Sequence, residues 1–131
     1  MKRPVELVQE VIRSSQFPFD EIFIDSIPKE ELDSINKTQV LLTESDDSPE
    51  DYGNSDFVTL LYGVYIQIFY TNSEDAAIDI TKVEIDLMKY LVSNDWLVVQ
   101  SQKHYLDPDT GQMIKNITVQ RTMTLSEIAN S

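Results

Sequence analysis

The sequence predicts an α+β domain in which an antiparallel sheet of four to five strands is flanked by two helices, in the order α-β-β-β-α-β-β. Residues 4–15 and 73–93 repeat apolar side chains every three or four positions, which is the period of a helix with one buried face. Residues 57–70 instead alternate in the manner of a half-buried strand. A length of 131 residues fits one core, so residues 1–131 are predicted to form a single domain.

The N-terminal third contains the first helix and two short strands. Pro4 suits the first position of the helix, where its missing N–H costs nothing, and Pro18 prevents any continuation. Residues 20–26 alternate as a short strand, residues 29–35 favour a helical turn, and residues 38–43 favour a second strand.

An acidic segment follows at residues 44–56, with six acids, no base, and both Pro49 and Gly53. This composition predicts a flexible polar loop. A loop of this length is often functional or ordered by a partner. The candidate residues for such a partner-ordered loop are Asp46, Asp47, Glu50 and Asp51.

The long strand and the long helix are the strongest signals in the chain. Every even-numbered residue from 58 to 70 is apolar or aromatic, so this face should meet the core, and Gly63 should mark a bend or bulge. The predicted helix has a core stripe and a second apolar stripe to one side, so its apolar arc is wider than packing on one sheet requires. The core stripe is Ile80, Val83, Leu87 and Leu91; the second stripe is Ile78, Ile85 and Val92.

Two arrangements could cover the second stripe. The N-terminal helix could pack on it through Val8 and Ile12, or a neighbouring subunit could cover it in a head-to-tail contact. Ile78, Ile85 and Val92 are therefore a possible subunit interface.

The remaining residues form a hairpin, in which strands at 96–105 and 112–125 are joined by a turn at 106–111.

The composition argues against several classes of protein. The net charge is −13, and residues 1–95 carry all of the excess, with 20 acids against 7 bases. Such a surface repels phosphate, so we expect no specific nucleic-acid binding. Charged residues interrupt the N-terminal segment before an apolar stretch typical of a signal peptide can form, and no apolar segment has the length of a membrane span. We therefore expect a soluble protein made in the cytoplasm.

We find no predicted catalytic, metal or cofactor site. His104 is the only histidine and cysteine is absent, so a zinc site or a Ser-His-Asp triad has no support. The three glycines are too far apart for a phosphate-binding loop. Asp107 and Asp109 resemble a calcium loop only superficially, because the later ligands are missing, and a hairpin turn is the favoured interpretation.

The order of elements resembles the tail-terminator and tail-completion (head-tail joining) proteins of long-tailed bacteriophages, and also small siphophage proteins of unknown function from Gram-positive hosts. The similar stretches are VELVQEVI (5–12), FVTLLYGVYIQIFY (57–70), ITKVEIDLMKYLVSNDWLVV (80–99) and ITVQRTMTL (117–125).

The resemblance implies a non-enzymatic virion protein of a phage or prophage, assembled in the cytoplasm of the bacterial host. It implies a homo-oligomeric ring, commonly a hexamer, that caps the tail tube and contacts tail-tube and neck proteins. The alternative is a small acidic protein-binding module, such as an adaptor, immunity or anti-defence protein.

Overall fold

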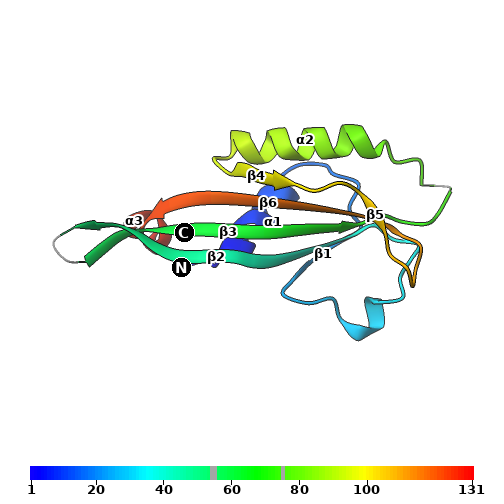
Figure 1. Cartoon of the computed structure of the whole chain (residues 1–131), viewed down its shortest axis with the longest axis horizontal. Coiled ribbons are helices and arrows are strands. Elements are labelled where there is room, and N and C mark those ends of the chain that lie inside the picture. Colours follow the sequence, from blue (N-terminus) through cyan, green and yellow to red (C-terminus); the bar gives the residue numbers. More distant parts are fainter. Residues whose placement is uncertain (54–55, 75) are drawn as a thin grey trace.

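The computed structural model describes residues 1–53, 56–74 and 76–131. It confirms the α+β class, with helices flanking one sheet (Figure 1). The elements in chain order are α1 (Pro4–Arg13), β1 (Glu21–Ile24), the 3₁₀ turn η1 (Lys29–Glu31), β2 (Gln39–Gly53), β3 (Asp56–Phe69), α2 (Ile80–Ser93), β4 (Leu97–Ser101), β5 (Tyr105–Leu106), β6 (Met113–Thr124) and α3 (Leu125–Ala129).

Within the described residues the sheet has six strands and is mixed, whereas four to five antiparallel strands were expected. The strand order is β1-β2-β3-β6-β4, and the short β5 also pairs with β6. β1 lies parallel to β2, and the other pairs are antiparallel. Parallel neighbours need a long crossover, which residues 25–38 provide through η1. The sequence showed this segment only as a turn, so the direction of β1 could not be deduced from it.

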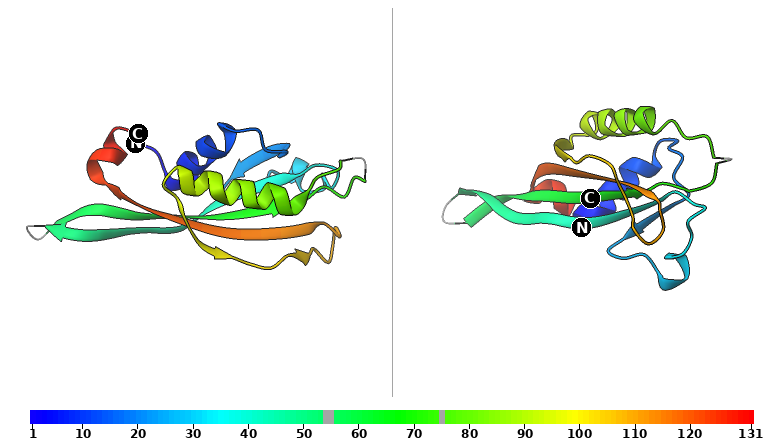
Figure 2. Two further views of the ribbon diagram at one scale, coloured as in Figure 1. Left: turned by 90° about the horizontal axis from the view of Figure 1, so that it is seen from above. Right: turned by 45° about the vertical axis from the view of Figure 1, so that its right-hand side comes forward.

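One face of the sheet and the helices above it enclose the core. α1 and α2 both lie on this face (Figure 2). The even-numbered residues of β3 from Leu60 to Ile68 pack in the core, as predicted, whereas Val58 is 48% exposed. Trp96, directly after α2, is 1% exposed and closes the core at the end of that helix. Fully buried residues include Val8, Ile12, Val64, Ile66, Leu87 and Leu91.

The prediction of a loop at residues 44–56 was wrong for most of that segment. Residues 44–53 belong to β2, and Asp46 to Gly53 pair with Gly63 to Asp56 of β3. A strand is stabilised chiefly by its cross-strand neighbours. Pairing with the apolar and aromatic β3 therefore stabilises residues 44–53 as a strand, although their acidic composition has little strand propensity of its own. Residues 54–55 of the predicted loop lie outside the described residues.

Gly63 was expected to mark a bend or bulge in its own strand; the structure places a β-bulge beside it, in the facing strand β2. The register between β2 and β3 shifts between Glu44 and Asp46. A Cβ atom on Gly63 would lie 2.5 Å from the Ser45 hydroxyl oxygen and 2.9 Å from the Asp46 Cβ. Glycine is therefore required for the bulged strand to approach β3 this closely.

The long helix is shorter than predicted at its N-terminal end. α2 begins at Ile80 instead of residue 73, and Asp79 caps it by accepting a hydrogen bond from the Lys82 backbone N–H at 3.2 Å. The segment before the helix is held in another way, since the Asn72 N–H donates to the Ile35 carbonyl at 2.8 Å. None of the described helices has the length and apolar character of a membrane span.

Candidate subunit interface

The bulge begins a projecting hairpin that we call the arm, made of residues 45–53 of β2 and the facing residues 56–63 of β3. β1 stops pairing at Leu42 and β6 stops at Thr59, so the end of the arm has no further strand beside it among the described residues. The arm extends past α3 at one end of the molecule (Figure 1). Two paired strands alone bury little apolar surface, so a contact with another surface would stabilise this segment.

The predicted acidic residues all lie on the arm. Asp47 and Asp51 are exposed, whereas Asp46 and Glu50 are half-buried. The Thr59 hydroxyl donates to Asp51 at 2.8 Å, and the Ser48 hydroxyl donates to Asp46. Because the outer edge of β2 is unpaired here, these charges disfavour edge-to-edge pairing between two identical arms.

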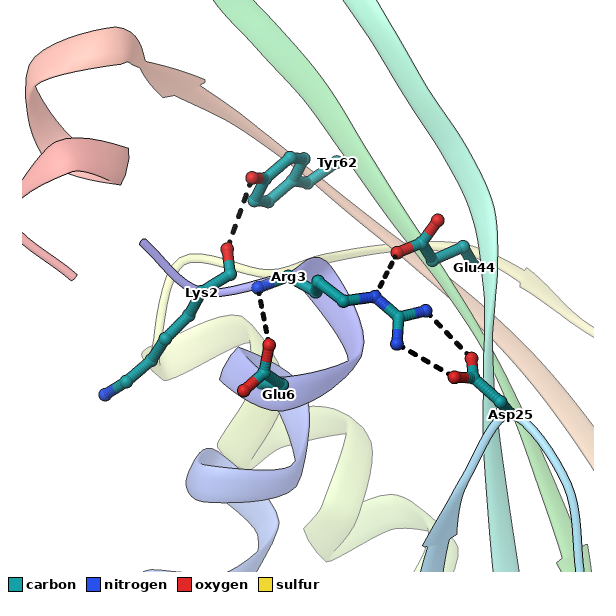
Figure 3. A network of polar contacts seen from close by, with 6 residues as sticks. All are labelled: Lys2, Arg3, Glu6, Asp25, Glu44 and Tyr62. Atoms are coloured by element: carbon teal, nitrogen blue, oxygen red, sulfur yellow. Dashed lines mark hydrogen bonds and ion pairs between the residues drawn. The ribbon is translucent and has the colours of Figure 1, made fainter.

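A cluster of ion pairs fixes the start of the chain beside the bulge (Figure 3). The Arg3 guanidinium donates to both carboxylate oxygens of Asp25, each at 2.8 Å, and its Nε donates to Glu44 at 3.0 Å. Arg3 therefore joins the first turn of α1, the end of β1 and the start of the bulge. The bidentate hydrogen bonds from Arg3 hold the pKa of Asp25 below its ordinary value. The Tyr62 hydroxyl donates to the Lys2 carbonyl at 3.3 Å, next to this cluster.

A mostly apolar hollow of about 410 Å³ lies at the base of the arm, and we call it the root hollow. The lining of the root hollow includes the carboxylate of Asp47. Partial burial raises the pKa of Asp47, and the negative charges of Glu44 and Asp46 raise it further. The positive charge of Arg3 lowers the pKa of Asp47, but the other three causes outweigh it, so the ionised form of Asp47 is disfavoured. The apolar lining comes from Met1, Pro4, Phe57, Leu60, Leu125 and Ile128.

The second stripe predicted on the long helix is only partly on that helix. Ile78 precedes α2 and packs against the core, whereas Ile85 and Val92 are 45% and 53% exposed. This exposure shows that α1 does not cover them, and Val8 and Ile12 of α1 are instead fully buried in the core. Ile85 and Val92 therefore form an apolar surface that the subunit leaves in solvent.

Sequence reasoning missed one buried polar cluster. The Glu84 side chain is buried on the core side of α2, where the Tyr70 hydroxyl donates to it at 2.7 Å. The His104 Nε2 lies 2.7 Å from the same carboxylate oxygen. Burial and the Glu84 charge raise the pKa of Tyr70. The signal was available, because Glu84 lies four residues after Ile80 and three before Leu87, on the core stripe itself.

This cluster anchors the segment after β4 to α2. The remaining candidate carboxylates form a turn, as predicted: Asp107 accepts from the Asp109 N–H at 2.9 Å, and Gly111 has a φ of 74°. Among the described residues, no group of three or more acidic, histidine or cysteine side chains is placed to hold a metal ion.

Comparison with known proteins identifies the family but no activity. A family model described as a protein of unknown function, DUF806, matches residues 2–124, so the chain belongs to this family. No curated protein matches the chain.

Proposed function

We propose that this member of the DUF806 family is a structural subunit of a siphophage tail, of the tail-terminator type. It forms a homo-oligomeric ring that caps the tail tube and joins it to the neck proteins, and it performs no catalysis. The observation that carries this proposal is the arm, a strand pair that projects beyond the core and has an apolar hollow at its base. A subunit whose strands extend past its own core is suited to contact a neighbour.

The placement of the exposed apolar groups favours a ring over a two-fold dimer. Ile85 and Val92 belong to α2, which runs along one side of the molecule (Figure 1). The root hollow is lined by other segments, namely the N-terminus, the arm and α3. A contact between two different surfaces is head-to-tail, and such contacts close into rings or extend into filaments. An isologous pairing of two β2 edges would instead bring like charges together.

The net charge of −13 fits a protein that DNA must pass without adhering to it. Most carboxylates have no basic partner, since 23 acids face only 10 lysines and arginines. Carboxylates lining or rimming a channel repel phosphate, which keeps the path open for DNA movement.

Light scattering coupled to size exclusion, across a range of protein concentrations, tests the proposal. A ring former gives a concentration-dependent oligomer, and electron microscopy of that oligomer should show rings that also bind the ends of purified tail tubes. A monomer or dimer at every concentration would support the protein-binding module instead. Tight, salt-sensitive binding to duplex DNA would contradict a repulsive channel surface.

A further inference from the structure

We propose that the exposed face of α2, formed by Ile85, Lys89 and Val92, docks into the root hollow of a second copy of this chain. This inference rests on the proposed ring, and it names the contact that holds neighbouring subunits together. Lys89 of one subunit then pairs with Asp47 of the next.

The α2 side of this contact is one continuous face. Residues 85, 89 and 92 are spaced by four and three, which places them on one side of a helix. All three are exposed. Asp86, three residues before Lys89, already pairs with Lys82. Lys89 has no ion pair within the part of the chain that the structure describes. The face thus presents one positive charge between two apolar side chains.

The root hollow complements this face of α2 both in its apolar lining and in its negative charge. Its lining is mostly apolar, and its carboxylate, Asp47, has two further acids beside it that raise its pKa. Lys2 and Arg3 line the same hollow but already pair with Glu10, Asp25 and Glu44. A lysine from outside would relieve the repulsion among the acids, while the apolar side chains beside it fill the hollow.

The occupant is a second copy of the chain because both halves of the contact are present on every subunit. Within one molecule Lys89 and Asp47 form no ion pair with each other, and both are exposed. Repeating the same contact from subunit to subunit satisfies every hollow with one helix.

A charge exchange tests the contact. Lys89→Glu should raise the concentration at which half of the subunits are assembled by about tenfold or more, because it places a like charge against Asp47. Asp47→Lys should do the same without unfolding the subunit, since the new lysine lies beside Glu44 and Asp46. The double variant restores the attraction in reversed order and should assemble nearly as well as the wild type.

Lys29→Glu is the matched control, because Lys29 is exposed on η1, belongs neither to α2 nor to the lining of the root hollow, and gives the same change in net charge. It should assemble as the wild type does, and circular dichroism should show that all variants remain folded. Normal assembly of Lys89→Glu, or a double variant that fails to recover, would overturn this contact but leave the ring possible. A wild-type protein that stays monomeric at every concentration would overturn both.

Discussion

Replacing Gly63 with alanine should destabilise the protein through a single methyl group. The added Cβ would lie 2.5 Å from the Ser45 hydroxyl oxygen and 3.0 Å from the Asp46 backbone nitrogen. The Ser45 side chain can rotate away, but the backbone of the bulge cannot move without breaking the β2–β3 hydrogen bonds between the bulge and the tip of the arm. Overpacking of this kind costs about 1–3 kcal/mol. Urea denaturation should therefore show a lower midpoint with an unchanged slope.

Gly53→Ala is the matched control for this variant. Among the described residues its Cβ would meet only the Val58 side chain, at 3.7 Å, which is ordinary contact. Since alanine restricts the unfolded chain more than glycine does, this variant should be as stable as the wild type or slightly more so. If Gly63→Ala unfolds at the same urea concentration as Gly53→Ala, the close approach of the bulge to β3 does not constrain this position, and our account of the bulge fails.

Three further predictions concern the core, the exposed helix face and the acidic hollow. Leu87→Ala should lose about 2–5 kcal/mol of unfolding free energy because Leu87 is fully buried, and a loss below about 1 kcal/mol in chemical denaturation would show that this stripe is not core. Ile85→Asp should keep the circular dichroism and melting temperature of the monomer but abolish the oligomer, and an unfolded variant would contradict the solvent exposure of Ile85. Asp47→Asn should stabilise the protein at neutral pH, because an acid whose pKa is raised on folding opposes folding once it is ionised. This gain should disappear below about pH 4, where the unfolded chain is protonated as well, and a gain independent of pH would exclude the charge as its cause.

The parts of the fold predicted from sequence are those with strong local periodicity. α1, β3, the C-terminal two thirds of the predicted long helix and most of the final hairpin follow from apolar spacing alone. The hairpin prediction was wrong at two points, because residues 102–104 interrupt the strand predicted at 96–105, and Leu125 begins the third helix, α3, instead of ending β6. The parallel direction of β1 and the strand conformation of residues 44–53 do not follow, because both depend on pairing with distant strands. The local sequence of such a segment gives its own conformational propensity, but it does not show which distant strand will pair with it.

The same distinction separates the predicted site residues from the missed ones. Ile85 and Val92 were recognised because an apolar arc wider than the sheet requires is visible in one helix. The root hollow was not recognised, because its lining comes from the N-terminus, the arm and α3, which are adjacent only in the folded chain. The ion pairs of Arg3 could not be predicted for the same reason, since Asp25 and Glu44 lie 22 and 41 positions after it in the sequence.

The bulge connects the glycine, the acids and the proposed contact in one physical argument. After the extra residue at Ser45, the alternation of β2 shifts by one position, so Asp47 lies opposite Tyr62 on the side of the sheet that carries α1. Without the bulge, Asp46 would occupy that position, and Asp47 would face the opposite side. The close approach permitted by Gly63 therefore determines that the root hollow contains Asp47. Loss of that glycine should weaken subunit assembly by more than the loss of subunit stability accounts for, because it misplaces the carboxylate that we propose receives Lys89.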